Sequence, residues 1–261
     1  MYGGVVIMEQ FERRQKIAEL VNSKGKVKVT ELSELFGISE VSVRSDLADL
    51  EAKGLLSRIH GGAVSSYKTY YNMDMQQRLS ANRDNKDKIA ARVAQMIEDN
   101  DTVMLNSGTT TLSIFRRIPQ GLNLSIVTNS IVIALEAAGN PSFNVVLLGG
   151  AVNPKYQFVY GDNAIAQLKG YHADKLILSV DGITAADGFT TYYDREAELD
   201  RLMLSNSATR IVAADSSKLG RTAFKHIAPI TDADYIITNS ESLATDDIEE
   251  LKEYNPNIIT V

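Results

Sequence analysis

Apolar and polar residues alternate with a helical period along the first part of the chain. Residues 9–24 carry apolar side chains that can share one face of a helix, and Gly25 is its natural end. The pattern then predicts a short second helix, capped by Thr30 and broken by Gly37, because a tight helix–helix corner needs a positive φ. A third helix is expected between a cap at Ser39 and a stop at Gly54.

The third predicted helix has two unlike faces. Val43, Leu47 and Leu50 recur at i, i+4 and i+7, which predicts a buried stripe. The opposite face carries small or hydrogen-bonding residues around one arginine: Val41, Ser42, Arg44, Ser45, Ala48 and Ala52. A helix–turn–helix protein presents the N-terminal end of such a helix to base edges in the major groove. Small residues would let the helix lie deep there, and Arg44 could reach a guanine or a phosphate.

The segment that follows, LLSRIHGGAV, predicts a short β-hairpin, or wing, with Arg58 and His60 placed to touch a DNA backbone. A three-helix protein-interaction module with solvated Arg and Lys side chains would have the same helix spacing. The stretch ERRQKIAELV, VTELSELFGIS, SVRSDL and LEAKGLLSRIHGGA resembles, in order and spacing, the winged helix–turn–helix of the DeoR family of bacterial transcription regulators. The resemblance favours DNA binding, for which the candidate residues are Val41, Ser42, Arg44, Ser45, Arg58 and His60.

One position departs from the pattern of that family. The family usually has two successive arginines before its Asp-Leu, and here the second is Ser45, so the preferred operator is expected to differ. Asp46 lies near the core edge of the helix and is interpreted as structural, pairing within the domain.

Beyond residue 84, short β-rich apolar runs alternate with helical ones. Residues 65–80 have no sustained period and are interpreted as a linker between a domain at 1–64 and a domain at 81–261. After a helix within 84–100, strands are expected at 102–106, 124–129, 143–150, 175–183, 209–217 and 233–239, with helices around 109–117, 130–138 and 194–206. This alternation predicts a mainly parallel, layered α/β sheet, in which ligands gather at the carboxyl ends of the strands.

Small polar residues follow almost every predicted strand. In MLNSGTTTLS a strand ends at Asn106, Gly108 allows a ligand to approach the backbone, and N–H groups and hydroxyls at the helix start can converge on an anion. An ordinary strand–helix turn would look the same, and the stretch is neither a Walker A loop nor a GxGxxG fingerprint. Three further strand ends repeat the arrangement, in LLGGAV, SVDGI and AADSSKLGR. In SVDGI, Asp181 can accept hydrogen bonds from sugar hydroxyls. In AADSSKLGR, Lys218 supplies a positive charge that can bind a phosphate or a carboxylate.

The second part of the chain resembles the effector-binding domain of the DeoR family, which is Rossmann-like and similar in fold to ribose-5-phosphate isomerase. The resemblance covers residues 75–240, through NSGTTT, VTNS, LLGG, DGI, DREAE and DSSK. It implies a pocket for a phosphorylated sugar or related metabolite, formed by Ser107, Gly108, Thr109, Thr110, Gly149, Gly150, Asp181, Gly182, Glu196 and Lys218. The family commonly has Asp where this chain has Asn106, so ligand affinity or charge preference is expected to differ.

An enzyme is the alternative interpretation of the same residues. Asp181, Glu196 and Lys218 supply an acid, a base and a cation, the groups that proton abstraction beside a carbonyl needs. A sugar-phosphate isomerase with an appended helical domain would fit them, but a binding site without turnover needs the same groups. The three histidines are too scattered to suggest a metal site, and no metal or cofactor is expected.

Composition and charge refine this picture. The chain has no cysteine, which excludes a disulfide framework, and no apolar run reaches the roughly 18–20 residues of a membrane span. A cytoplasmic protein with no membrane association is therefore expected. Residues 1–66 hold nine of the 27 Lys and Arg and nine of the 33 Asp and Glu, so the whole net charge of -6 lies downstream. This asymmetry indicates two functional halves.

These observations together predict a ligand-controlled transcription regulator, a repressor of a carbohydrate-metabolism operon. Its first domain would bind double-stranded operator DNA, and its second would bind a phosphorylated sugar. A homodimer or higher homo-oligomer is expected, because one winged helix reads only a few base pairs and two-fold sites are read by dimers.

Overall fold

The computed structural model describes residues 10–52, 55–65, 73–240 and 245–261. The chain divides into two compact units, Met1–Met73 and Asp74–Val261. The division falls inside the segment that the sequence indicated as a linker.

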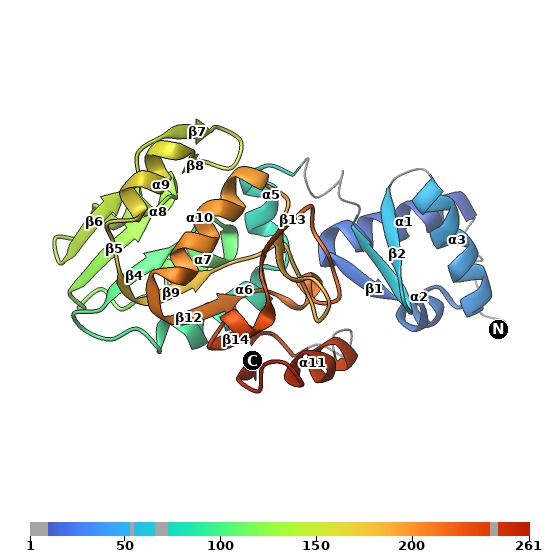
Figure 1. Ribbon diagram of the computed structural model, residues 1–261. Coiled ribbons are helices and arrows are strands. Elements are labelled where there is room, and N and C mark those ends of the chain that lie inside the picture. The colour runs from blue at the N-terminus through green and yellow to red at the C-terminus, as the bar shows by residue number, and fades with distance from the viewer. Residues whose placement is uncertain (1–9, 53–54, 66–72, 241–244) are drawn as a thin grey trace. The chain divides into compact units, whose positions relative to one another are not determined.

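In its described residues, the first unit has three helices and a small antiparallel sheet (Figure 1). Its elements are α1 (Gln10–Lys24), β1 (Lys26–Lys28), α2 (Val29–Phe36), α3 (Glu40–Ala52), β2 (Leu56–Ile59) and β3 (Gly62–Ser65). The strand order is β1-β3-β2, so the predicted wing is the β2–β3 hairpin, and β1 is an additional strand that pairs with it. The apolar stripes of the three helices meet in one core, which includes Ile17, Leu32, Val43 and Leu47.

One predicted helix boundary in this unit is confirmed and another is wrong. Gly37 ends α2 with a φ of 62°, as expected for a tight corner. Thr30 was predicted as a cap and instead lies inside α2, which begins at Val29. The backbone N–H of Val29 donates to the carbonyl of Gly61 at 2.8 Å, so the wing satisfies one of the donors that the first turn of the helix leaves without a partner. The predicted stop at Gly54 lies outside the described residues.

The second unit is built around a seven-stranded sheet. Its strand order is β15-β14-β12-β9-β4-β5-β6, and all neighbouring strands are parallel, which confirms the predicted layered α/β architecture. The sheet strands are β4 (Thr102–Leu105), β5 (Leu124–Thr128), β6 (Phe143–Leu147), β9 (Ala173–Leu178), β12 (Ser207–Ala213), β14 (Tyr235–Thr238) and β15 (Ile258–Thr260). The helices are α5 (Met75–Ser80), α6 (Arg83–Ala94), α7 (Thr109–Phe115), α8 (Ile131–Ala137), α9 (Asp162–Leu168), α10 (Asp194–Ser205) and α11 (Thr245–Lys252).

Two smaller sheets accompany the large one. A β7–β8 hairpin (Ala151–Asn153 and Phe158–Tyr160) follows the edge strand β6. A three-stranded antiparallel sheet consists of β10 (Gly182–Thr184), β11 (Gly188–Thr191) and β13 (Lys225–Ala228). The run at 175–183, predicted as one strand, is therefore divided between β9 and β10.

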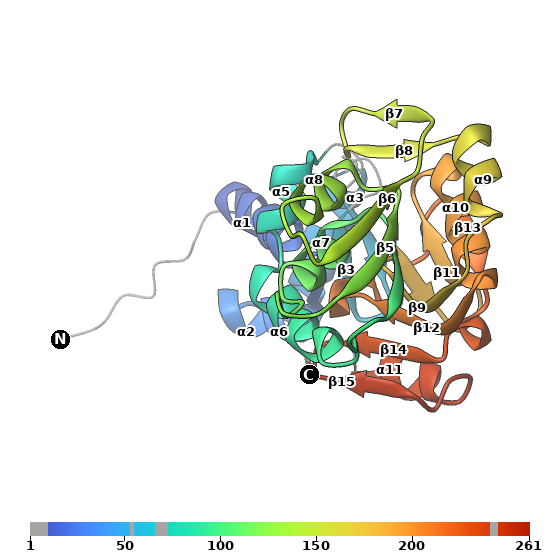
Figure 2. The ribbon, with the colours of Figure 1, turned by 90° about the vertical axis from the view of Figure 1, so that its left-hand side faces the viewer.

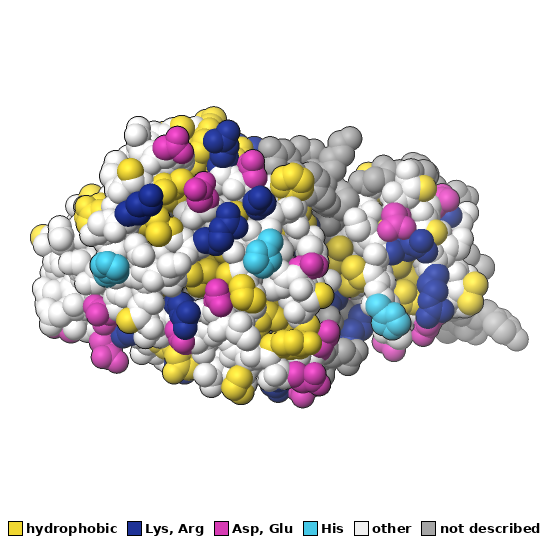
Figure 3. Space-filling model, viewed as in Figure 1, with side chains coloured by type: hydrophobic (Ala, Val, Ile, Leu, Met, Phe, Trp, Pro, Cys, Tyr) yellow, Lys and Arg dark blue, Asp and Glu magenta, His cyan; other side chains and the backbone are white. Residues whose placement is uncertain are grey.

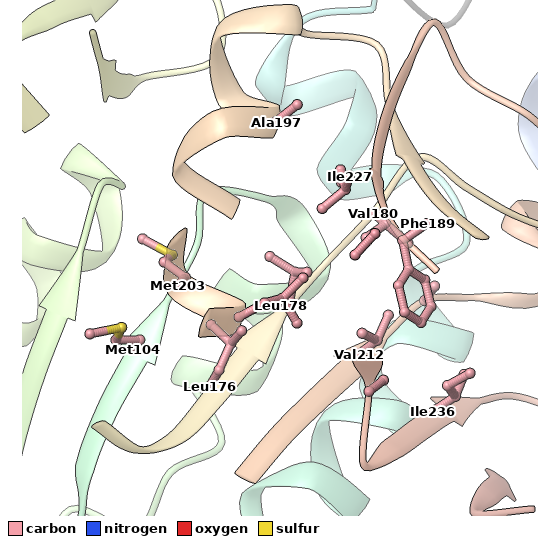
Figure 4. Packing of buried hydrophobic residues seen from close by; sticks show 14 of the residues in the cluster. Met104, Leu176, Leu178, Val180, Phe189, Ala197, Met203, Val212, Ile227 and Ile236 are labelled. Carbon is pink, nitrogen blue, oxygen red and sulfur yellow. The ribbon is translucent and has the colours of Figure 1, made fainter. Parts of the chain in front are cut away.

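The strands of the large sheet are apolar on both faces, and each face has its own core. Along β4, Val103 and Leu105 point into the core beneath α6, α7 and α8, whereas Met104 points into the core beneath α9 and α10. Figure 2 shows helices on both sides of the sheet, and Figure 4 shows Met104 and Met203 in the second core. Burial on both faces explains the continuous apolar runs of the sequence.

Residues 75–80 form helix α5, although the sequence pattern placed them in the linker. Asp74 and Gln77 form a capping box, in which Asp74 accepts from the Gln77 backbone at 2.8 Å and Gln77 accepts from the Asp74 backbone at 2.9 Å. Met75 anchors the short helix in the core. None of the helices in the described ranges has the length and apolarity needed to cross a membrane.

Candidate functional site

The first unit exposes one face of helix α3. Ser39 caps the helix by accepting a hydrogen bond from the Ser42 backbone at 3.2 Å. Val43, Leu47 and Leu50 are buried, whereas Val41 is 74% exposed and Arg44 and Ser45 are exposed beside it. The N-terminal half of α3 is thus an accessible surface of small side chains around one arginine.

Two exposed arginines of the first unit, Arg44 on this surface and Arg58 on the wing, are paired with carboxylates of the same unit. Arg44 contacts Glu40 at 2.6 Å, one helical turn away. Arg58, on the wing, donates from its backbone and from its Nε to Glu51 of α3, each at 2.7 Å, and these hydrogen bonds lower the pKa of the Glu51 carboxyl. Exposed pairs of this kind are worth about 0–1 kcal/mol, so a phosphate can replace the carboxylate. His60 is exposed at the turn of the hairpin.

Asp46 lies on the buried side of α3 and joins this helix to α1. Its carboxylate accepts from the Nε atoms of Arg13 and Arg14, each at 2.7 Å, and from Gln10 at 3.3 Å. Burial would raise the pKa of Asp46, but the hydrogen bonds from Arg13, Arg14 and Gln10 lower it below its usual value. These contacts support the structural role expected for Asp46.

Figure 3 shows acidic and basic side chains interspersed on the visible face of the first unit.

In the second unit, charged side chains gather where the adjacent strands β12, β9 and β4 end. We call this group the strand-end cluster: Arg78, Lys86, Asp181, Glu196, Asp200, Asp215, Lys218 and Arg221. The sheet order places these three strand ends side by side, as the parallel topology predicted. Three of the predicted site residues, Asp181, Glu196 and Lys218, belong to the cluster.

The carboxylates of the cluster are linked through hydroxyl groups. The Ser107 hydroxyl donates to Glu196. The Thr191 hydroxyl oxygen lies 3.2 Å from Oδ2 of Asp181 and 3.4 Å from Oε2 of Glu196. Burial raises the pKa of Glu196 to about 7 against the hydrogen bond from Ser107, and the charge of Asp181 adds to the increase. Burial and, after it, the charge of Glu196 raise the pKa of Asp200 well above its usual value.

Four cations lie among these acids. Burial lowers the pKa of Lys218 to about 8 and that of Lys86 to about 8, although the charge of Asp215 opposes both decreases. Arg78 lies 3.8 Å from Asp181, and Arg221 donates from Nε to the Tyr192 hydroxyl at 2.6 Å. Burial would raise the pKa values of Asp181 and Asp215, but nearby cations hold both below the usual value.

Two predicted glycines allow close contacts beside the cluster. A Cβ on Gly108 would lie 2.0 Å from the Ser179 hydroxyl, and one on Gly182 would lie 2.3 Å from the carbonyl of Arg221. Thr109 and Thr110 are buried in the first turn of α7. The positions after β4 and β9 therefore require glycine for packing, whatever they also do for a ligand.

Gly149 and Gly150 follow the edge strand β6, and their predicted place in the effector site stays a prediction. Gly149 donates its N–H to Gln167 at 3.0 Å, and a Cβ on Gly150 would lie 2.6 Å from the carbonyl of Tyr160. They follow β6, the edge strand of the sheet, which β5 separates from β4. The pair therefore supports α9 and the β7–β8 hairpin.

Sequence reasoning missed Arg78 and Lys86. Arg78 lies in the segment interpreted as a linker, and Lys86 is on a helix, where lysine is usually solvated. Lys86 is 4% exposed and donates to the carbonyl of Ala81 at 2.6 Å. The capping box before α5 was the one local signal that this segment belongs to the folded unit.

Comparisons with known proteins cover both units. A family model described as a DeoR-like helix-turn-helix domain matches residues 13–69, and one described as the DeoR C terminal sensor domain matches residues 81–240. An uncharacterized HTH-type transcriptional regulator of Bacillus subtilis, YulB, is 34% identical over 88% of this chain and 88% of its own length. A putative aga operon transcriptional repressor of Escherichia coli O157:H7 is 33% identical, over 96% of this chain and 93% of its own length.

Further relatives show the same full-length similarity. The lactose phosphotransferase system repressor of Streptococcus mutans is 30% identical, over 95% of this chain and 98% of its own length. Among solved structures, a ribose 5-phosphate isomerase of Methanocaldococcus jannaschii is 16% identical over 52% of this chain and 54% of its own, with a TM-score of 0.39. A structural likeness of that size carries no argument about chemistry.

Proposed function

Because the chain belongs to the DeoR family of transcriptional regulators, we propose that it represses a carbohydrate-metabolism operon under the control of a phosphorylated sugar. Relatives named as repressors of the aga operon and of the lactose phosphotransferase system support the sugar-related role. These relatives are named as regulators and repressors, so the isomerase alternative is set aside.

The first unit is the DNA-reading part in this proposal. Val41, Ser42, Arg44 and Ser45 on the exposed end of α3 would face the bases of the major groove. Arg58 and His60 on the wing would contact the flanking phosphates. Phosphate contact would exchange the weak pairs of Arg44 and Arg58 with Glu40 and Glu51 for stronger charge-assisted hydrogen bonds.

The charge balance of the strand-end cluster is the observation that carries the effector assignment. Four cations, Arg78, Lys86, Lys218 and Arg221, accompany two carboxylates whose pKa values are lowered, Asp181 and Asp215. The raised pKa values of Glu196 and Asp200 favour the neutral forms of these two acids, and a phosphate monoester of roughly −1.5 to −2 charge would balance the positive excess that results. Asp181, Glu196 and Ser107 supply acceptors and a hydroxyl for the sugar.

Regulation requires that the ligand favour one arrangement of the DNA-reading units over another. By linkage, operator DNA must then change ligand affinity by the same factor. Two or more copies would act together, since a two-fold operator is read by a dimer. The protein would act in the cytoplasm, where the DNA of a bacterial cell lies.

A fluorescence-polarisation titration tests the proposal. The duplex upstream of the protein's own gene is compared with a scrambled duplex at two salt concentrations, because phosphate contacts make affinity fall with salt. We expect tight, salt-sensitive binding that prefers the upstream duplex and that responds to one of a panel of sugar phosphates but not to the matching unphosphorylated sugar. Equal affinity for both duplexes would contradict operator recognition, and a response to the unphosphorylated sugar would contradict the phosphate assignment.

A further inference from the structure

A second cationic site lies apart from the strand-end cluster, in the same unit. Helices α5 and α6 and the C-terminal end of α7 line an open pocket of about 610 Å³. We call it the arginine pocket, and it is lined by Gln76, Leu79, Ser80, Arg83, Asp87, Ser113, Arg116 and Arg117. Figure 2 shows these three helices together on one side of the sheet. The volume is within the range of about 300–1,000 Å³ that is usual for small-molecule pockets.

The lining of the pocket has an excess of positive charge. It contains three arginines and one carboxylate, Asp87. Arg116 is held by Glu136, to which its Nε and Nη2 donate at 3.0 and 2.6 Å. Arg83 and Arg117 are exposed and form no side-chain hydrogen bond or ion pair with any residue in the described ranges. Two guanidinium groups are therefore available to a ligand.

The other polar groups of the pocket define what the ligand must offer. Ser80 and Ser113 already donate their hydroxyl hydrogens to the carbonyls of Gln77 and Thr109, each at 3.0 Å. These hydroxyl oxygens can still accept hydrogen bonds, so donors for an anion come from the arginines and from the side-chain amide of Gln76. The planar guanidinium group donates in pairs to phosphate or carboxylate oxygens. The pocket suits a molecule with a phosphate-type group and a hydroxyl-bearing part.

The pocket and the strand-end cluster share a wall. Arg78 of α5 and Lys86 of α6 belong to the cluster, whereas Leu79 and Arg83 of the same two helices line the pocket. The neighbouring Asn82 donates to Asp215 of the cluster at 2.9 Å, at the corner between α5 and α6. An anion bound in the pocket would contact α5 and α6, the same helices that carry these cluster residues.

We propose that the arginine pocket is a second anion site, which binds a small phosphate-bearing molecule of at least two negative charges independently of the strand-end cluster. Arg83 and Arg117 hold the anion, and Arg116, fixed by Glu136, completes the cationic wall. The proposal does not depend on the identity of the sugar phosphate or on operator recognition.

The test uses inorganic pyrophosphate and the full-length protein in isothermal titration calorimetry. The variants are the double substitution Arg83→Gln/Arg117→Gln, the control Lys88→Gln, and Lys218→Ala in the strand-end cluster. Lys88 is an exposed cation of α6 outside the pocket lining, so its substitution changes the charge of the same helix without touching the site. Because Arg83 and Arg117 are exposed, the double variant is expected to keep the wild-type melting temperature.

We expect pyrophosphate to bind the wild-type protein, Lys88→Gln and Lys218→Ala, and to bind the double variant at least about tenfold more weakly, since each lost charge-assisted contact costs that order. Unchanged binding in the double variant would overturn the proposal, as would loss of binding in Lys218→Ala alone or absence of binding to the wild-type protein. A double variant that keeps pyrophosphate affinity and loses operator affinity would assign the arginines to the DNA backbone instead.

Discussion

The side-chain amide of Asn106 donates a hydrogen bond to Oδ1 of Asp200 at 3.2 Å, at the base of the strand-end cluster. The same amide nitrogen donates to the carbonyl of Ser179 at 2.9 Å, and the amide oxygen accepts from Thr111 and from the Ser179 backbone. Asn106 is 1% exposed, so all of these contacts are made away from water. An aspartate here, as the family pattern commonly has, would place two buried carboxyl groups against each other.

Asn106→Asp is therefore expected to destabilise the second unit by about 1–3 kcal/mol at neutral pH, because a donor facing Asp200 becomes an acceptor. The two carboxyls would share a proton with a raised pKa. The stability that this shared proton provides is complete at low pH and is lost as the pH rises through its pKa in the folded state. The destabilisation caused by Asn106→Asp therefore grows with pH. Urea unfolding at about pH 5 and pH 8 measures it. The exposed Asn144→Asp is the control, and an equal, pH-independent effect in both variants would contradict the prediction.

Arg44→Ala is expected to weaken operator binding by about 1–3 kcal/mol while leaving sugar-phosphate binding intact, because Arg44 lies on the exposed face of α3. Polarisation titrations over a range of salt concentrations separate two roles. A base contact relaxes specificity at one position, whereas a phosphate contact lowers the salt slope by roughly one. Lys16→Ala, an exposed cation of α1, is the matched control. Operator affinity equal to wild type would refute the assignment of α3 as the reading helix.

Lys218→Ala is expected to abolish the response to the sugar phosphate and to preserve operator binding, because Lys218 is a buried cation of the strand-end cluster. The measurement is release or tightening of a labelled operator complex during titration with the effector. Lys225→Ala, on the exposed part of β13, should behave as wild type. A normal response of Lys218→Ala would move the phosphate site away from this lysine.

Glu196 makes a pH-dependent contribution to stability. Burial raises its pKa from 4.5 to about 7, so the folded state binds this proton more tightly than the unfolded state does. The resulting stability is complete below about pH 4.5 and is lost as the pH rises through about 7. Relative to Glu196→Gln, the wild-type protein should therefore lose up to about 3 kcal/mol between these limits.

Chemical unfolding of the wild-type protein and Glu196→Gln across this pH range measures the difference. Glu198→Gln changes an exposed carboxyl of the same helix and should follow the wild-type curve. Parallel curves for the wild-type protein and Glu196→Gln would show that Glu196 is ionised throughout.

Asp46→Asn is expected to destabilise the first unit by about 3 kcal/mol, because it removes the buried charge that pairs with Arg13 and Arg14. Operator affinity should fall with the population of the folded unit, and effector binding should be retained. Asp49→Asn, which breaks a more exposed pair with Arg14, is the control and should cost less. A small effect at Asp46, no larger than at Asp49, would contradict its role as the anchor between α1 and α3.

Much of the architecture follows from local patterns. The stripe of Val43, Leu47 and Leu50 predicted the buried face of α3, and the apolar runs predicted the strands of the parallel sheet. Helix starts were less predictable, as Thr30 illustrates, because the first N–H of α2 donates to the carbonyl of Gly61 in the distant wing. The division of 175–183 into β9 and β10 likewise depends on pairing with distant strands.

The sequence by itself predicted the two-domain order and the strand ends that carry Asp181 and Lys218, because periodicity and motif spacing are properties of neighbouring residues, and the resemblance to the family added Glu196. Only the tertiary structure decided which residues complete the cluster. Asn82 meets Asp215 across 133 positions of the chain, and Lys86 and Arg78 join from helices with no motif. It also gave Gly149 and Gly150 packing contacts with Gln167 and Tyr160 that the sequence pattern does not show. Contacts between residues distant in sequence, and the burial that shifts their pKa values, exist only once the sheet is assembled.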